Sequence, residues 1–173
     1  MYQVILINGG SCSGKTTICK EICKQSNDQF IHLQVDEAKK YLFTTNFKIS
    51  SREVARSICD EILLQTAKIF LQNDKNVVID TTFNEQDDAI KLMKYHVDFF
   101  KDEKVLFVGI DCSVEERLRR FREYNDNPVR SEREIVAQSN VFELCKEFYD
   151  VEFDSSKLSI EGIVSEILTL LNI

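Results

Sequence analysis

The stretch that decides the fold is "NGGSCSGKTT", residues 8–17, which holds three of the five glycines in the chain. It satisfies the pattern G-x-x-x-x-G-K-[ST], directly after an apolar run typical of a strand and directly before a pattern typical of a helix. Glycines permit tight turns and close approach of the backbone, and successive N–H groups converge with the positive end of the following helix. The stretch therefore predicts a phosphate loop that binds the triphosphate of a nucleotide.

Individual residues of this phosphate loop have distinct expected roles. Lys15 is expected to reach the β- and γ-phosphates and to serve catalysis there, and Thr16 is expected to ligate Mg²⁺. Cys12 is expected to contribute backbone alone; the alternative is a reactive thiolate, favoured by the neighbouring lysine and helix N-terminus. A glycine turn beside an incidental lysine is the alternative for the whole loop. The predicted nucleotide-binding residues are Gly9, Gly10, Ser11, Cys12, Ser13, Gly14, Lys15, Thr16 and Thr17.

Two aspartates that follow apolar strands are the expected partners of the phosphate loop. In "NVVIDTTF", residues 76–83, Asp80 ends the strand and is expected to hold Mg²⁺ directly or through water. In "LQVDEAKKYLF", residues 33–43, Asp36 is expected to be the catalytic base. Because the carboxyl ends of parallel strands face one crevice, Asp36 could orient an acceptor hydroxyl toward the γ-phosphoryl group. For both aspartates the alternative is a helix N-cap.

The arginines are concentrated in one segment of an otherwise acidic chain. The only proline, Pro128, lies in the same segment, in a polar stretch that breaks the helical pattern. We expect residues 117–133 to form a lid that swings over the phosphate loop. Six of the eight arginines lie there, namely Arg117, Arg119, Arg120, Arg122, Arg130 and Arg133.

The lid arginines are expected to stabilise the negative charge that spreads over a phosphoryl group during transfer. Arg130 and Arg133 are the predicted catalytic pair. Arg117 and Arg120 are predicted to bind the nucleotide, since a spacing of three residues puts them on one helix face. The other two arginines of the helix are expected to face solvent, and a wholly solvated charged face is the alternative for the group.

The composition bounds the class of protein. With 173 residues, 43% hydrophobic and 29% charged, we expect one globular domain, residues 1–173. No apolar run approaches membrane-spanning length and no secretory signal is recognisable, so we expect no membrane partner and a cytoplasmic location. The net charge of −7 argues against nucleic acid as a partner. The six cysteines are expected to be reduced and mostly buried, and neither histidine is expected to be a ligand or a base.

Short apolar runs rich in β-branched residues alternate with longer helical patterns. Their near-continuous hydrophobicity indicates strands that are covered on both faces, and the intervening helices favour parallel, right-handed connections. The sequence therefore predicts the α/β class with a five-stranded parallel sheet flanked by helices. The expected strands cover residues 2–7, 30–35, 76–80, 104–111 and 149–153.

Serines followed three residues later by glutamate mark the starts of three helices. These pairs are Ser50 with Glu53, Ser113 with Glu116, and Ser131 with Glu134. Apolar positions at helical spacing extend the first helix through Val54, Ile58, Ile62 and Ile69. They extend the third through Ile135, Phe142, Cys145 and Phe148, and they mark a closing helix at Ile160, Ile163, Val164, Ile167, Leu168 and Leu171.

With these residues in place, the chain resembles the chloramphenicol phosphotransferase-like family of P-loop small-molecule kinases, which is related to zeta-toxin-type and nucleotide kinases. The matching pieces are "ILINGGSCSGKTTI", "VDEA", "VVIDTTF", "VGIDCSVEERLRR", Arg130 with Gln138 eight residues on, and "FYDVEFDSS". The resemblance implies a phosphate loop from Gly9 to Thr16, a base at Asp36 and a Walker B acid at Asp80. This chain departs from the family at Thr81, where a second aspartate is common.

The resemblance and the residues together predict an ATP-dependent phosphotransferase whose acceptor is a hydroxyl of a small molecule. The sheet is then expected to run from the second strand through the third, first and fourth to the fifth. A zeta-toxin-like sugar-nucleotide kinase and a nucleotide or polynucleotide kinase are the enzyme alternatives. A nucleotide-dependent switch is the alternative of another class, although no N-K-x-D occurs in the chain. The acceptor and the oligomeric state stay open.

Overall fold

The five apolar runs form one parallel sheet. The computed structural model describes residues 2–38, 52–83, 86–124 and 131–173. The strands lie in the order β2-β3-β1-β4-β5, so the predicted class, strand number and order are confirmed. Their bounds are β1 (Val4–Gly9), β2 (Phe30–Gln34), β3 (Asn76–Thr81), β4 (Val105–Asp111) and β5 (Val151–Asp154).

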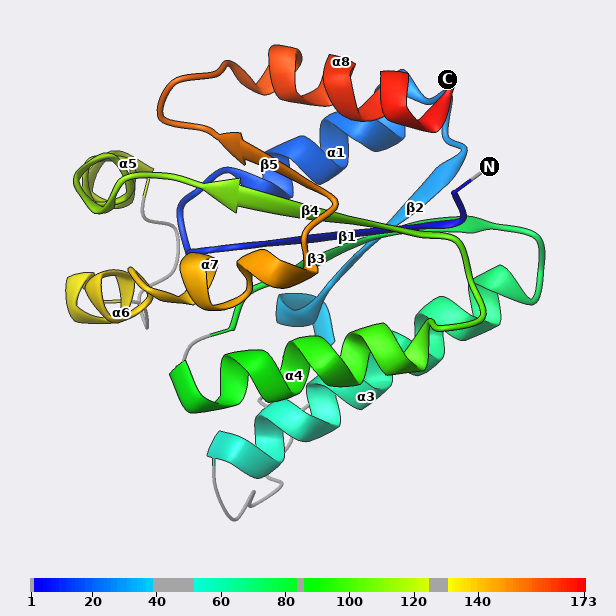
Figure 1. Cartoon of the computed structure of the whole chain (residues 1–173), viewed down its shortest axis with the longest axis horizontal. Helices are drawn as coiled ribbons and strands as arrows, with labels where there is room; N and C mark the ends of the chain where they lie inside the picture. Colours follow the sequence, from blue (N-terminus) through cyan, green and yellow to red (C-terminus); the bar gives the residue numbers. More distant parts are fainter. Residues whose placement is uncertain (1, 39–51, 84–85, 125–130) are drawn as a thin grey trace.

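Helices cover both faces of the sheet, as Figure 1 shows. One face carries α1 (Lys15–Gln25) and α8 (Ile160–Leu171). The opposite face carries α3 (Arg52–Leu71), α4 (Gln86–Phe99) and the short α7 (Val141–Leu144). Alternate residues of a strand therefore enter different cores, and all six residues of β1 are buried. This double coverage explains why the strands have unbroken apolar sequences.

The helix predicted to run through Val54 and Ile69 forms as α3, but its buried face differs from the predicted one. Leu63, Leu64 and Ala67 pack against the sheet, whereas Val54 is 43% exposed and Ile69 59% exposed. Apolar residues occur on several sides of this 20-residue helix, so periodicity alone does not single out the packed side. The cap predicted at Ser50 lies outside the described residues.

The helix predicted to begin after Ser131 begins there but is shorter than expected. Ser131 and Glu134 form the predicted capping box of α6 (Glu132–Ala137). The helix ends at Ala137, with Gln138 as its C-cap, and the chain turns before α7 and a 3₁₀ turn, Lys146–Phe148, follow. The prediction of one continuous helix was wrong because apolar spacing persists across a polar turn. Of its apolar positions, Cys145 nevertheless reaches the core that contains Leu6 of β1, and Phe148 packs against that core.

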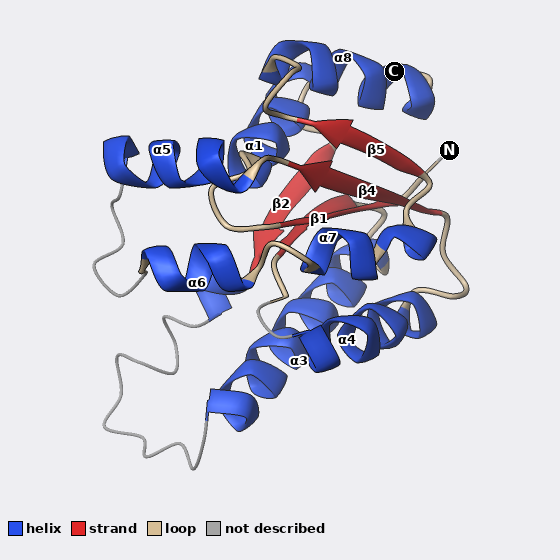
Figure 2. Ribbon diagram, turned by 60° about the vertical axis from the view of Figure 1, so that its left-hand side comes forward, coloured by secondary structure: helices blue, strands red, loops and turns tan. Residues whose placement is uncertain are grey.

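The arginine-rich helix α5 (Val114–Tyr124) begins as predicted, with the Ser113 hydroxyl accepting from the Glu116 N–H at 3.2 Å. Figure 2 shows α5 and α6 side by side, beyond the end of the sheet where β4 finishes. The closing helix α8 also forms as predicted. Within the described ranges, no helix is long and apolar enough to cross a membrane.

Candidate active site

The phosphate loop connects the end of β1 to the start of α1. Gly14 caps the helix with a φ of 93°, a left-handed conformation that residues with a side chain rarely adopt. Gly10 leaves room for a different group: a Cβ at this position would lie 2.2 Å from Nη1 of Arg117 and would displace the guanidinium from the loop. The glycine pattern thus allows a tight turn and also lets a guanidinium group lie against the loop backbone.

Lys15 and Thr16 occupy the first turn of α1, beneath this loop. The Lys15 side chain is 5% exposed, and its Nζ donates to the Gly10 carbonyl at 2.9 Å. The Thr16 hydroxyl donates to the carboxylate of Asp80, which is 7% exposed at the end of β3. The two residues predicted to hold Mg²⁺ are therefore in direct contact. A hydroxyl and a carboxylate are the oxygen ligands that this cation prefers, so the pair suits Mg²⁺ chemically.

Arg117 is the predicted nucleotide-binding arginine that lies deepest in the protein. It is 3% exposed, and its Nε donates to the Cys112 carbonyl at 3.2 Å. Its buried Nη1, which faces Gly10, has no hydrogen-bond partner in the described part of the chain. Burial lowers the pKa of Arg117 from its usual value, yet guanidinium groups stay protonated in proteins. A buried cation with an unused donor beside the phosphate loop is suited to an anion.

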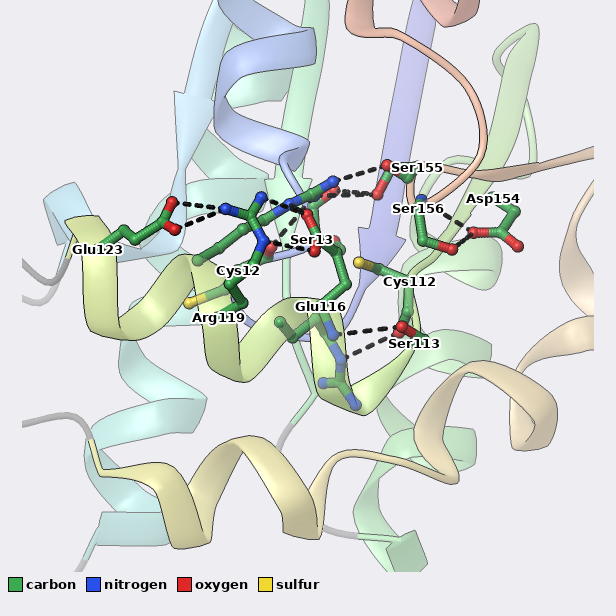
Figure 3. A network of polar contacts seen from close by, with 12 residues as sticks. Cys12, Ser13, Cys112, Ser113, Glu116, Arg119, Glu123, Asp154, Ser155 and Ser156 are labelled. Atoms are coloured by element: carbon green, nitrogen blue, oxygen red, sulfur yellow. Dashed lines mark hydrogen bonds and ion pairs between the residues drawn. The ribbon is translucent and has the colours of Figure 1, made fainter.

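Arg120 ties the phosphate loop to the segment after β5. Its Nη2 donates to the Ser155 carbonyl at 2.6 Å, and its Nη1 donates to the Cys12 carbonyl at 3.4 Å. The Ser155 hydroxyl in turn donates to the Ser13 carbonyl at 2.7 Å. Figure 3 shows the surroundings of this network, with Cys12, Ser13, Glu116 and Ser155 labelled. Arg120 also forms an ion pair with Glu116. The guanidinium of Arg120 is thus held by the protein at the edge of the loop.

The other lid arginines lie in different surroundings. Arg119 pairs with Glu116 and Glu123, and Arg122 pairs with Glu132, all at the surface as expected. Arg133 is exposed on the first turn of α6. Arg130 lies outside the described residues. The catalytic roles of Arg130 and Arg133 therefore stay predictions, as does closure of the lid.

Gln138 is a contact of the phosphate loop that reasoning from single residues missed. Its Oε1 accepts from the backbone N–H of Ser11 at 2.6 Å, and its side chain is 4% exposed. The contact places the end of α6 against the loop that α5 also touches. Its only signal in the sequence is its spacing from Arg130 in the family pattern.

Asp36, the predicted base, lies in a helical turn, residues 35–38, directly after β2. Its side chain is exposed. In the parallel pairing of β2 with β3, Gln34 stands opposite Asp80, so Asp36 follows at the same edge of the sheet. This is the edge at which a base for the acceptor was expected. Its catalytic role stays a prediction.

Two side chains that were not expected at the site lie beside Asp80. The Sγ of Cys19, a ring nitrogen of His32 and a carboxylate oxygen of Asp80 all lie within 4.8 Å of one another. Burial lowers the pKa of His32, which keeps the imidazole neutral near pH 7. The expectation that His32 is an ordinary strand residue missed this neighbourhood, because only the strand pairing creates it.

Solved structures of two kinases and of an antibiotic resistance protein share this fold. A shikimate kinase from Acinetobacter baumannii in complex with shikimate aligns with 99% of this chain and 93% of its own, with a TM-score of 0.68 and 18% identity. A sugar kinase from Janibacter sp. HTCC2649 aligns over 100% and 96%, with a TM-score of 0.73 and 16% identity. The tunicamycin resistance protein of Deinococcus radiodurans aligns over 98% and 96%, with a TM-score of 0.67 and 12% identity. At these identities the likeness shows the fold.

The family is shown by a comparison with family models. None of the curated proteins compared with the chain matches it significantly. The family model described as chloramphenicol phosphotransferase-like protein matches residues 2–172. This match confirms the resemblance inferred from the sequence motifs and supports phosphotransferase chemistry. The chain therefore belongs to the chloramphenicol phosphotransferase-like family, with the fold of the P-loop kinases.

Proposed function

We propose that the protein is an ATP-dependent kinase that transfers the γ-phosphoryl group of ATP to a hydroxyl of a small molecule. The observation that carries this proposal is the phosphate loop with Lys15, Arg117 and the Thr16–Asp80 contact gathered around it. Phosphoryl transfer depends on positioning and on stabilising negative charge, which these groups can do. Family membership supports the same chemistry.

In the proposed complex, the phosphates take donors that the protein now uses internally. Lys15 would exchange the Gly10 carbonyl for phosphate oxygens, and Ser11 would exchange Gln138 for one. Arg117 would contribute the Nη1 donor that has no partner among the described residues. Each exchange replaces a neutral acceptor, or no acceptor, with a charged one, and charge-assisted hydrogen bonds are the stronger kind.

Thr16 and Asp80 would hold Mg²⁺, which, when bound, neutralises part of the charge on the phosphates. Arg130 and Arg133 would add donors from the lid. Asp36 would accept the proton of the acceptor hydroxyl while the acceptor oxygen bonds to the γ-phosphorus and the bond to the β–γ bridging oxygen breaks. ADP and the phosphorylated acceptor are then the products.

The test is ATP-to-ADP turnover with Mg²⁺ across a panel of hydroxyl acceptors. The panel contains chloramphenicol, shikimate, simple sugars, nucleosides, UDP-N-acetylglucosamine and 5′-hydroxyl oligonucleotides, and products are identified by mass spectrometry. Lys15→Ala and Asp36→Ala serve as inactive controls, and Asp74→Asn, an exposed acid distant from the phosphate loop in sequence, serves as the active one.

Stimulation by one acceptor, with a product heavier by one phosphoryl group and no product from Lys15→Ala or Asp36→Ala, would support the proposal and identify the acceptor class. Nucleotide binding that selects guanine over adenine, with no acceptor stimulating turnover, would instead favour a nucleotide-dependent switch.

A further inference from the structure

Three side chains of different chemistry converge between α1 and the sheet, where Cys19 and Asp80 are buried and His32 is partly exposed. The Sγ of Cys19, a ring nitrogen of His32 and a carboxylate oxygen of Asp80 are mutually within 4.8 Å. They come from α1, β2 and β3, three elements that are separate in the sequence. Sulfur, imidazole nitrogen and carboxylate oxygen form a mixed donor set that is unlike the all-oxygen set Mg²⁺ prefers.

The local folding of each element explains the convergence. Cys19 follows Thr16 by three residues, so both lie on the face of α1 turned toward the sheet. His32 pairs with Val78 in the parallel register, and Asp80 lies two residues beyond Val78 on the same face of β3. Val78 and Cys19 belong to the same core, which confirms that this face is the one covered by α1.

Cys19 and His32 could both offer an atom to a bound cation. Cys19 is fully buried and forms no disulfide. The Nε2 of His32 is also buried and has no hydrogen-bond partner among the described residues. Buried polar nitrogens are almost always satisfied, so an imidazole that has an unpartnered nitrogen, and a ring nitrogen near the thiol and the carboxylate, points to a ligand.

We propose that Cys19, His32 and Asp80 form a binding site for a thiophilic divalent cation, with Zn²⁺ as its representative. Protein bonds to Zn²⁺ are about 2.0–2.3 Å long, which places the donors of a tetrahedral ion about 3.5 Å apart. No separation in the cluster exceeds 4.8 Å, so each has to shrink by at most about 1.3 Å, which side-chain rotation can supply. On binding, the Cys19 thiol releases its proton to solvent and forms the metal–sulfur bond, and a water molecule completes the coordination.

The site shares Asp80 with the contact made by Thr16. A cation that holds this carboxylate through Cys19 and His32 draws it away from Thr16, so the cation opposes binding of ATP with Mg²⁺. This regulatory consequence rests on the proposed function. Binding of the cation itself does not, because it can be measured without nucleotide or turnover.

The experiment uses the full chain with Co²⁺ as a spectroscopic stand-in for Zn²⁺. We expect one Co²⁺ per chain, a thiolate-to-cobalt charge-transfer band, and loss of the band on adding Zn²⁺. Cys19→Ser and Cys19→Ala should abolish the band, and His32→Asn should weaken binding. Cys23→Ala, a partly exposed cysteine one turn further along the same helix, is the matched control and should keep the band.

The results that would overturn the cation site differ from those that would overturn its competition with ATP. A wild-type protein without the band, or a band that survives in both Cys19 variants while circular dichroism shows them folded, would overturn the site. A second arm measures Zn²⁺ affinity with and without ATP and Mg²⁺. Because ATP itself binds Zn²⁺, affinities are referred to free Zn²⁺ set by a metal buffer. Weaker Zn²⁺ binding in their presence, seen in wild type and Cys23→Ala, would then support competition for Asp80; unchanged binding would refute it. Failure of the kinase proposal would leave the cobalt result intact.

Discussion

The hydroxyl of Thr16 on helix α1 donates a hydrogen bond to the carboxylate of Asp80 at the end of strand β3, although 64 residues separate the two in sequence. The contact follows from the parallel pairing of β1 with β3, in which Ile7 stands opposite Asp80. The chain leaves β1 through the phosphate loop and enters α1. The first turn of α1 therefore lies next to the carboxyl end of β3, where Asp80 is located. The fold alone thereby brings together the two oxygen-bearing side chains that are proposed to hold Mg²⁺.

Replacing Asp80 by asparagine should remove the charge while keeping an acceptor for Thr16. We expect the affinity for ATP with Mg²⁺ to fall at least about tenfold, because interactions with charged groups contribute about 1.5–3 kcal/mol. ATP without Mg²⁺ should bind as well as before or better, since the variant lacks a carboxylate that repels phosphate. Calorimetry with and without Mg²⁺ measures both affinities. The exposed Asp74→Asn, which makes the same charge change, should alter neither; equal losses in both variants would contradict the assignment.

Arg117 should matter for nucleotide binding and not for folding. Arg117 is 3% exposed, and its Nη1, which faces Gly10, has no hydrogen-bond partner among the described residues. An apolar replacement therefore removes a buried charge whose hydrogen bonds are only partly formed in the folded protein. Arg117→Met should therefore keep or raise the free energy of unfolding, while ATP binding weakens at least about tenfold.

Urea unfolding and calorimetry on the same samples test the two halves of this prediction. Arg119→Met, on an exposed part of the same helix, loses the same charge and should leave ATP affinity nearly unchanged. A destabilised Arg117→Met with normal ATP affinity would show that the arginine is structural.

Gln138 should compete with phosphate for the N–H of Ser11. Gln138→Met removes the acceptor 2.6 Å from that nitrogen and leaves a largely buried donor without its present partner. The free protein should lose about 1–3 kcal/mol of stability, and ATP should bind more tightly because no glutamine oxygen has to be displaced. Unfolding without nucleotide and ATP titration measure the two effects, with the exposed Gln65→Met as control. Weaker ATP binding would mean that Gln138 assists the nucleotide.

The sequence predicts the fold well because its signals are local. Strand ends, the loop and the serine caps each depend on a few neighbouring residues, and the capping box at Ser131 forms as its pattern predicts. The contact of Gln138 with Ser11 depends on how α6 ends, and the cluster around His32 depends on the register of β2 against β3. No local pattern encodes either relationship. The prediction of which side of α3 packs against the sheet was wrong for the same reason, because packing is not encoded locally. Ile69 fits the helical period but faces solvent.

A second buried polar cluster lies on the opposite face of the sheet, between α3, α4 and Phe83, which follows β3. Asp60 and Arg56 form an ion pair with a 2.7 Å contact, and the Arg56 guanidinium lies 5.8 Å from the centre of the Phe83 ring. The His96 ring packs edge-on against Phe83 with 5.6 Å between centroids. His96 is fully buried, and neither of its ring nitrogens has a hydrogen-bond partner in the described ranges.

His96 should make the folded state sensitive to mild acid. Burial, with a smaller contribution from the Arg56 charge, lowers its pKa from 6.5 to about 3. Between these values the unfolded chain binds a proton that the folded chain rejects, so stability is present above pH 6.5 and is lost as the pH falls. One such group changes the free energy of unfolding by up to about 1.4 kcal/mol per pH unit. Urea unfolding between pH 7 and 5 should therefore show a shallower pH dependence for His96→Leu than for the wild type. Identical slopes would mean that the buried imidazole is protonated in the folded protein.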